Sequence, residues 1–302
     1  MKSYAMGIDF GSTTAKVVIL DENGQVVASA ISQKGVVSDE GVRVALAEAL
    51  RQAHIEQSAV GKVVSTGYGR RMLDIADRSI TEITCHARGA VALVPDVQVV
   101  IDIGGQDSKV IAIDPNGLVA RFAMNDRCAA GTGKFLEVLA RAVNIDIENM
   151  GTVALQATKT VSITSMCATF AETEVISLLA EGYEKPVVLA AVHLAVAKRT
   201  VGLVSRMGKR DPVVMTGGVS QNVAAVHFLQ QELKTTLIIP PGAQTAGALG
   251  AALFALDDLR SEKAEGSTKA EVLDDEVEQQ LALPQDCSPA CSKKTALVTF
   301  KH

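Results

Sequence analysis

The stretches "IDFGSTTAKVVI", residues 8–19, and "IDIGGQDSKVIA", residues 101–112, carry one pattern twice. Aligned without gaps, they share Ile, Asp, Gly, Lys and Val at equivalent positions. Each follows or forms a run of β-branched residues, which is typical of buried strands. Each copy therefore predicts a strand, a turn at Asp-x-Gly and a second strand, so that an Asp and several backbone amides lie at the tip of a hairpin.

The rest of the chain alternates between strand and helix signals. The turns "DENG" (21–24) and "DPNG" (114–117) predict a third strand in each half, giving two meanders. The later elements expected are helices at 42–53, 134–143, 173–182 and 187–207, a strand at 212–218, a helix from about 221, a strand at 236–240 and a helix at 246–256. The sequence thus predicts a duplicated α/β fold.

Three regions are expected along the chain. Residues 1–95 form a first lobe, whose closing helix returns from the C-terminal end of the core, and residues 96–256 form a second lobe. Residues 257–302 are expected to be a flexible acidic linker and a tail containing cysteines. The stretch 257–286 supports this, because it carries ten acidic and three basic side chains without a sustained apolar face.

Composition excludes several classes of protein. With 302 residues, 48% of them hydrophobic, the chain can bury large cores. It shows neither an apolar run of roughly 18 residues nor a signal sequence, so we expect a cytoplasmic protein that does not bind membranes. A net charge of −5, 3% aromatic residues and no Trp argue against nucleic-acid binding.

The two hairpins suit a nucleotide and its metal ion. Asp9 and Asp102 are candidates for holding hydrated Mg²⁺. Further candidates for binding the nucleotide lie in the same two hairpins. They supply hydroxyl groups, a lysine, and glycines that let the backbone approach phosphate: Gly11, Ser12, Thr13, Thr14, Lys16, Gly104 and Gly105. Lys16 and Lys109 are ambiguous, since either could point to phosphate or to solvent.

A third segment, "MTGGVSQN" (215–222), predicts a strand that ends in Gly-Gly before a helix, which suits the adenosine part of a nucleotide. Its candidate nucleotide-binding residues are Gly217, Gly218, Gln221 and Asn222. A single Asp-x-Gly turn is most often an ordinary β-turn. Three such elements in order favour a nucleotide site.

Two cysteines precede predicted helices in similar settings, Cys128 in "MNDRCAAGTGKF" (124–135) and Cys167 in "SITSMCATFAE" (162–172). A Walker-type phosphate loop is excluded at Cys128, because the pattern fails at both ends. A nucleophilic thiol lacks a His within the motif. Judged from the residues alone, a buried structural cysteine and a metal ligand both remain for each position.

The ordered segments "GIDFGSTTAKVVIL", "VIDIGGQDSKVI", "VVMTGGVSQN" and "AQTAGALGAAL" resemble the ATPase superfamily of actin, heat-shock chaperones and sugar kinases, with its duplicated ribonuclease-H-like fold. The segments "STGYGRRML", "TEITCHARGA", "MNDRCAAGTGKFLEV" and "ITSMCATFAETEVISLLAEG" more closely resemble the activators of 2-hydroxyacyl-CoA dehydratases, which are related to the BadF/BadG/BcrA/BcrD ATPases. The resemblance covers about residues 4–256.

This resemblance implies a 4Fe-4S cluster shared by a homodimer, with Cys128 and Cys167 of both chains as ligands. It further implies ATP-driven transfer of one electron to a dehydratase or acyl-CoA reductase component, with ferredoxin or flavodoxin as electron donor. Gln106 is then a candidate for positioning phosphate or the attacking water. A small-molecule kinase of the same fold and a non-redox protein that uses ATP as a switch are the alternatives.

The remaining cysteines are expected to have lesser roles. Cys85 and His86, in "TEITCHARGA", are interpreted as core packing residues. Cys287 and Cys291 lie in the polar tail, where free thiols are expected.

Overall fold

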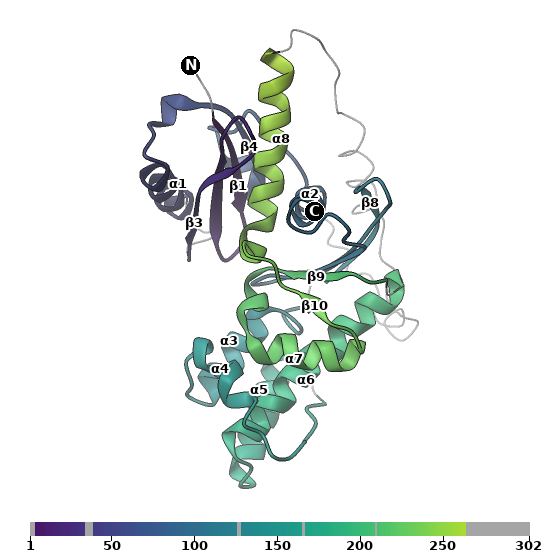
Figure 1. The fold of residues 1–302 in the computed structure, drawn as a ribbon. Helices are drawn as coiled ribbons and strands as arrows, with labels where there is room; N and C mark the ends of the chain where they lie inside the picture. The colour runs from purple at the N-terminus through teal and green to yellow at the C-terminus, as the bar shows by residue number, and fades with distance from the viewer. Residues whose placement is uncertain (1–3, 34–38, 126–127, 165–166, 209, 264–302) are drawn as a thin grey trace, which may run out of the picture. The chain divides into compact units, whose positions relative to one another are not determined.

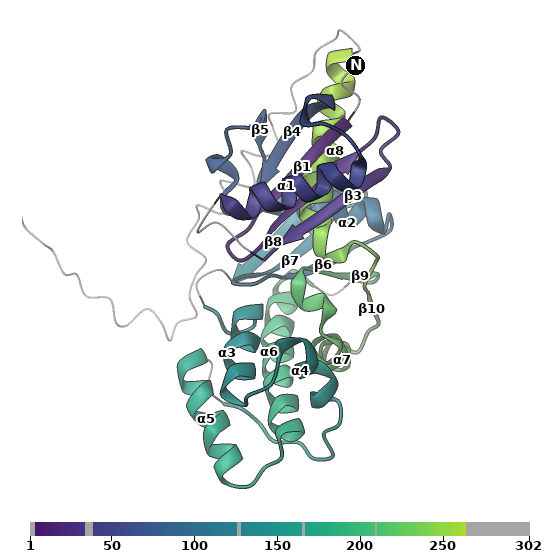
Figure 2. The same cartoon turned by 90° about the vertical axis from the view of Figure 1, so that its left-hand side faces the viewer.

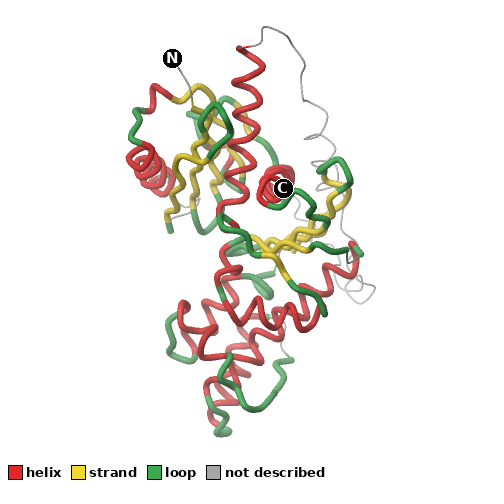
Figure 3. Tube along the Cα trace, in the orientation of Figure 1, coloured by secondary structure: helices red, strands yellow, loops and turns green. Residues whose placement is uncertain are grey.

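The structure, a computed structural model, describes residues 4–33, 39–125, 128–164, 167–208 and 210–263. Within these residues the strands form two five-stranded sheets, drawn in yellow in Figure 3. The first, of order β3-β2-β1-β4-β5, contains β1 (Tyr4–Phe10), β2 (Ala15–Leu20), β3 (Val26–Ser32), β4 (Val60–Thr66) and β5 (Arg78–Ser79). The second, of order β10-β9-β6-β7-β8, contains β6 (Val99–Ile103), β7 (Ser108–Ile113), β8 (Val119–Asn125), β9 (Val213–Thr216) and β10 (Leu237–Ile238).

The two sheets repeat one pairing scheme, which confirms the predicted duplication. β1 pairs antiparallel with β2 and parallel with β4, while β6 pairs antiparallel with β7 and parallel with β9. The third strands β3 and β8 complete the two meanders. In both hairpins the aspartate lies directly opposite the lysine, Asp9 opposite Lys16 and Asp102 opposite Lys109.

Helices cover both faces of the first sheet. Met6, Ile8 and Phe10 pack with α1 (Glu40–Ala53), the helix that lies across this face of the sheet in Figure 2. Alternate residues of a strand point to opposite faces. The other face accordingly carries Ala5 and packs against α8 (Ala246–Lys263), the long helix in Figure 1. Asp9 lies on this second face.

α2 (Glu82–Leu93) packs along α8 through glycines. A Cβ atom at Gly89 would lie 1.9 Å from the Ala246 carbonyl oxygen, and one at Gly250 would lie 1.8 Å from that of Cys85. Only glycine allows this contact between backbones. Cys85 itself is fully buried here, as expected for a core residue.

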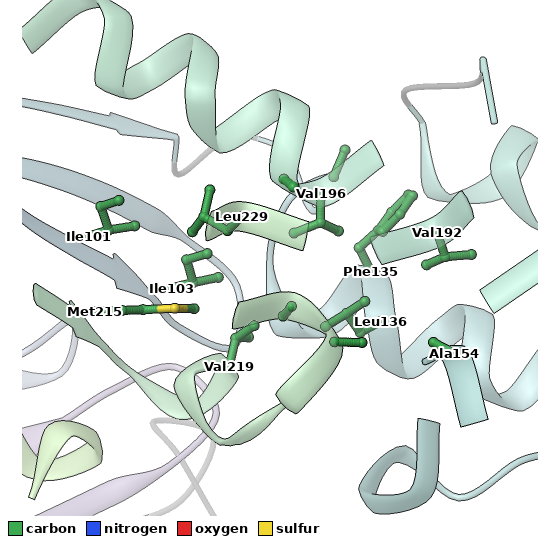
Figure 4. Close-up of a cluster of buried hydrophobic side chains, with 14 of the residues drawn as sticks. Ile101, Ile103, Phe135, Leu136, Ala154, Val192, Val196, Met215, Val219 and Leu229 are labelled. Atoms are coloured by element: carbon green, nitrogen blue, oxygen red, sulfur yellow. The ribbon is translucent and has the colours of Figure 1, made fainter. Parts of the chain in front are cut away.

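A group of helices covers one face of the second sheet, drawn below it in Figure 1. The helices are α3 (Gly133–Ala142), α4 (Ile147–Ala154), α5 (Ala168–Ala180), α6 (Lys185–Met207) and α7 (Val223–Leu233). Figure 4 shows part of their shared core, where Phe135 lies near Val192 of α6, and Ile103 of β6 lies near Leu229 of α7. The face that carries Asp102 points the other way and contacts α2. The first acidic hairpin therefore faces α8, and the second faces α2.

Short 3₁₀ segments connect these elements: Gln57–Ala59, Arg70–Met72, Gly218–Gln221 and Ala243–Thr245. α6 is long and apolar enough to cross a membrane, but 67% of its most apolar window is buried inside the protein. This burial is typical of a core helix of a globular domain.

The acidic segment begins later than the sequence predicted, because α8 continues to Lys263 rather than ending at residue 256. Leu259 is buried, and two of the acidic residues form ion pairs with the first sheet and α2: Asp258 with Arg78 at 2.8 Å and Asp257 with Arg88 at 3.2 Å. The burial of Leu259 on one side of the helix and the ion pairs of Asp257 and Asp258 on the other stabilise this extension of α8. The rest of the predicted linker and tail, with Cys287 and Cys291, lies outside the described residues.

Candidate functional site

Each hairpin buries its aspartate against its lysine. Lys16 Nζ lies 2.8 Å from Asp9 Oδ2, and Lys109 Nζ lies 3.2 Å from Asp102 Oδ2. Both aspartates are buried, at 4% and 2% exposure. Neither lysine points freely to solvent, which removes one of the two orientations left open by the sequence.

The parallel neighbour of each hairpin adds a threonine and a glycine. Asp9 is in register with Thr66 on β4, and Asp102 with Thr216 on β9. Gly67 and Gly217 follow these threonines with φ angles of 86° and 84°. A Cβ at Gly67 would lie 2.5 Å from Asp9 Oδ1, and one at Gly217 would lie 2.9 Å from Asp102 Oδ1. At both positions glycine is required for two reasons: the backbone adopts a positive φ angle, and a side chain would collide with the aspartate.

α2 contributes two residues that the sequence did not assign to the site. Glu82 Oε1 lies 3.7 Å from Lys109 Nζ, and His86 Nδ1 lies 3.4 Å from Asp102 Oδ1. His86 is buried, as expected for a packing residue, but its Nδ1 makes no hydrogen bond and faces the Asp102 carboxylate. The i,i+4 spacing of Glu82 and His86, which puts both side chains on one face of the helix, is the signal that could have identified them.

Burial and pairing set the charge states of these groups. Burial raises the pKa of Asp102, but His86, Lys109 and a hydrogen bond from Thr216 outweigh it and hold that pKa far below its usual value. The pKa of Asp9 is likewise lowered, because Lys16 and His86 outweigh burial. Burial lowers the pKa of Lys109, yet Glu82 and Asp102 raise it well above the ordinary value. Both aspartates are therefore carboxylates at neutral pH.

The site carries more acidic than basic side chains. Asp107 Oδ1 also lies 2.8 Å from Lys109 Nζ, so two lysines face four carboxyl groups: those of Asp9, Glu82, Asp102 and Asp107. Burial raises the pKa of Glu82. Carboxylate oxygens are the ligands that Mg²⁺ prefers, and one or two suffice when water completes its shell, so Asp9 and Asp102 fit a hydrated Mg²⁺.

The hairpin tips repeat the same turn and meet each other. Gly11 N donates to Thr14 O, and Gly104 N donates to Asp107 O, both at 3.0 Å. A Cβ at Gly105 would lie 2.3 Å from Thr13 Oγ1, so the tips are in contact. Other predicted residues at the tips differ in exposure: Ser12, Thr13 and Thr14 are half-buried, and Gln106 is exposed.

The predicted adenosine segment follows β9. Gly217 is buried beside Asp102, whereas Gly218 and Gln221 are exposed in the following 3₁₀ turn. The Asn222 side chain caps α7 by accepting hydrogen bonds from Ala224 N and Ala225 N. This cap explains Asn222 without a ligand, and nucleotide contact at these four positions stays a prediction.

The start of α3 is hydrogen-bonded to the tip of the second hairpin. Gly133 N donates to Gly104 O at 2.9 Å, and Lys134 N donates to Gly105 O at 2.7 Å. Cys128 lies in the loop just before α3, where Asn125 Nδ2 donates to its carbonyl oxygen at 2.8 Å. One short segment thus connects Cys128 to the acidic hairpin.

The two cysteines of interest differ in setting. Cys167 is the N-cap of α5 and is exposed, and hydrogen bonds from the backbone of Thr169 and Phe170 lower the pKa of its thiol. Cys128 is half-buried and precedes its helix by several residues, so the expected similarity holds only in part. Within the described residues, no group of three or more His, Cys, Asp or Glu side chains is placed to hold a metal ion in one chain.

A cavity of about 430 Å³ lies beside β4, lined by residues that include Gln57, Val63 and Asp77. Asp9, Asp102, their paired lysines and the cysteines are not among its lining residues. We therefore place the candidate site around Asp9 and Asp102 rather than in this cavity.

Two duplicated halves with paired acidic hairpins define the ribonuclease-H-like ATPase fold of actin, heat-shock chaperones and sugar kinases. The chain belongs to the BadF/BadG/BcrA/BcrD ATPase family, whose model matches residues 6–255.

Relatives in this family share much of the sequence. The chain is 45% identical to the activator of lactoyl-CoA dehydratase from Anaerotignum propionicum, over 84% of this chain and 98% of that protein. It is 42% identical to the 2-hydroxyisocaproyl-CoA dehydratase activator of Clostridioides difficile, over 87% and 98%. The solved structure of the latter activator with bound ADPNP has a TM-score of 0.84, at 41% identity, over 88% of this chain and 99% of that one. A glucokinase from Streptomyces griseus, 14% identical with a TM-score of 0.53 over 84% and 99%, shares the fold alone.

Proposed function

We propose that this protein is an ATP-driven one-electron carrier that activates a 2-hydroxyacyl-CoA dehydratase or a related acyl-CoA reductase component. The names of its relatives support the activator role, and the family supports the ATPase role. The electron comes from a 4Fe-4S cluster shared by a homodimer, and a ferredoxin or flavodoxin supplies it. The protein works in the cytoplasm.

Mg-ATP binds between the two hairpins. Asp9 and Asp102 hold the hydrated Mg²⁺, the backbone of the tips and the hydroxyl groups of residues 12–14 hold phosphate, and Gln106 positions phosphate or water. The lowered pKa values of these two buried carboxylates support this assignment. Because the tips touch in this structure, binding separates Thr13 from Gly105.

Cys128 and Cys167 hold the cluster. Both thiols are free of disulfides, and the lowered pKa of Cys167 favours the thiolate that iron requires. One chain supplies two thiolates, so a four-thiolate cluster needs a second copy related by a twofold axis. When bound, such a cluster supplies storage for a single electron.

The observation that carries this proposal is the hydrogen-bonded connection between the second hairpin and α3. Gly104 and Gly105 accept from the first two amides of α3, and the loop that precedes this helix contains Cys128. A movement of the hairpin on nucleotide binding would therefore move the start of α3 with it. This is how hydrolysis is coupled to the surroundings of the cysteines.

We expect Gly133→Pro to uncouple the two events. Gly133 is the first residue of α3, a helix position that proline can occupy, but the ring replaces the N–H that donates to Gly104 O and its Cδ forces that contact open. The preceding Thr132 has extended backbone angles, which suit a residue before proline. Without oxygen, iron removal by a chelator is followed with and without Mg-ATP. Mg-ATP should change the rate in the wild type and leave it unchanged in the variant, which still hydrolyses ATP.

Gly133→Ala is the matched control, because it retains the N–H and its Cβ would meet no atom closer than 3.2 Å. It should behave like the wild type. A proline variant whose iron removal still responds fully to Mg-ATP would show that the α3 connection does not couple the sites.

The kinase alternative rests on fold alone. Under anaerobic conditions, a carrier absorbs broadly near 400 nm (roughly, as iron-thiolate clusters do) and hydrolyses ATP without a phosphoryl acceptor. Colourless protein that phosphorylates a sugar or a carboxylate would favour the kinase instead.

A further inference from the structure

Thr66 and Thr216 occupy equivalent positions in the two halves. Each is the last residue of a strand that runs parallel to the strand bearing the aspartate, each is in register with that aspartate, and each precedes a glycine in the left-handed region. Directly paired residues of neighbouring strands point to the same face of the sheet. Thr66 therefore lies beside Asp9 as Thr216 lies beside Asp102.

The two hydroxyl groups nevertheless differ. Thr216 Oγ1 donates to Asp102 Oδ1 at 2.8 Å, whereas Thr66 Oγ1 is fully buried without a partner. Every other buried threonine of the described residues has a hydrogen-bond partner for its hydroxyl: Thr81, Thr84, Thr132, Thr200, Thr216 and Thr245. A buried hydroxyl without a partner is destabilising, so Thr66 is a deviation within its own fold.

A second buried polar side chain approaches the same place from α2. His86 is 5% exposed, and its Nδ1 lies 3.4 Å from Asp102 Oδ1 without a hydrogen bond. A Cβ at Gly247 would lie 2.8 Å from His86 Nε2 and 3.3 Å from Asp9 Oδ2, so the imidazole and the carboxylate flank the same point at the start of α8. The imidazole of His86 thus lies between the two aspartates, and the unpartnered hydroxyl of Thr66 is in register with Asp9.

We infer that Thr66 is a ligand-binding residue of the first half, whereas Thr216 is a positioning residue of the second. The hydroxyl of Thr66 binds an oxygen of the hydrated Mg-triphosphate, either a phosphate oxygen or a metal-bound water. Thr216 instead fixes the Asp102 carboxylate. The inference rests on the proposed nucleotide site and assigns different tasks to its two otherwise duplicated halves.

The test compares Thr66→Val with Thr216→Val in the full-length protein. Thermal unfolding without nucleotide is the first readout. Thr66→Val replaces an unpartnered hydroxyl with a methyl group, so the unfolding temperature should stay unchanged or rise. Thr216→Val removes a buried hydrogen bond to a carboxylate, so the unfolding temperature should fall.

Binding measured by calorimetry is the second readout, with a non-hydrolysable ATP analogue and Mg²⁺. Thr66→Val should weaken binding by about tenfold or more, since a hydrogen bond to a charged ligand is lost. Thr66→Ser, which retains the hydroxyl, should restore it. Repeating the titration with Mg-ADP and with chelated Mg²⁺ identifies the oxygen. A deficit confined to the triphosphate places Thr66 at the terminal phosphate, and one that vanishes without Mg²⁺ places it at a metal-bound water.

Two outcomes would overturn the inference. Unchanged affinity in Thr66→Val, with wild-type protein that binds the nucleotide, would mean that the hydroxyl does not contact the ligand. Equal losses of thermal stability in the two valine variants would mean that Thr66 is structural. In both cases the proposed function stands, whereas wild-type protein that binds no nucleotide would contradict the proposed function itself.

Discussion

Asp102→Asn is expected to lower the rate of Mg-ATP hydrolysis by about 100-fold or more, because it removes a buried carboxylate from the predicted Mg²⁺ site. The fold should survive. Lys109, which pairs with Asp102, keeps Asp107 at 2.8 Å and Glu82 at 3.7 Å, so its buried charge stays compensated. Phosphate release and thermal unfolding measured on the same preparation separate the two effects.

Asp114→Asn is the matched control. Asp114 follows β7, at the opposite end of that strand from Lys109, and its carboxylate accepts hydrogen bonds from Asn116 N and Leu118 N in a turn. Loss of this carboxylate should leave hydrolysis unchanged. Hydrolysis at the wild-type rate in Asp102→Asn would exclude Asp102 from the nucleotide site.

The equivalent change in the first hairpin needs a different design. Lys16 pairs with Asp9 alone in the described ion pairs, so Asp9→Asn would leave a buried ammonium group without its partner. Removing one member of a buried pair typically costs about 3–5 kcal/mol of stability. The double variant Asp9→Asn, Lys16→Met removes both charges, so a loss of hydrolysis there reports on function rather than on unfolding.

Cys128→Ala and Cys167→Ala are each expected to abolish iron binding, because either change leaves a shared cluster with two of its four thiolates. Iron and sulfide are measured after purification without oxygen. Nucleotide binding should remain, since neither cysteine belongs to the acidic hairpins. The Cys128 variant tests the loop before α3, and the Cys167 variant tests the cap of α5.

Cys85→Ala controls for the loss of a thiol as such. Cys85 is fully buried in α2 against α8, so its removal should reduce thermal stability and leave the iron content unchanged. If either predicted ligand variant retained the full iron content, the assignment of Cys128 and Cys167 as the ligand set would be wrong.

The duplicated hairpins could be predicted from sequence because their pattern is local. The turn at Asp-x-Gly, the β-branched strands and the lysine seven residues after each aspartate lie within a dozen residues of each other. The structure confirms the strand pairing and places Lys16 and Lys109 opposite their aspartates. The family resemblance also rested on short motifs, and the family model confirms it.

The missing parts of the site depend on tertiary contacts. Thr66 and Thr216 lie far along the chain from their aspartates and reach them only through parallel pairing of β4 and β9. His86 comes to Asp102 because glycine contacts hold α2 against α8. The threonine contacts leave no short motif in the sequence, whereas the i,i+4 spacing of Glu82 and His86 is a local signal for the helix contact. The end of α8 was missed because a charged segment was expected to be solvated, whereas Asp257 and Asp258 form ion pairs.

Mass in solution, measured together with iron content under anaerobic conditions, tests the shared cluster most directly. Light scattering is applied to the protein with its iron and after removal of iron by a chelator. The account predicts a dimer of the 31.6 kDa chain that contains about four iron atoms per two chains, with the dimer weakened when iron is removed. A monomer that retains one complete four-iron cluster would contradict it, since one chain would then hold all the ligands.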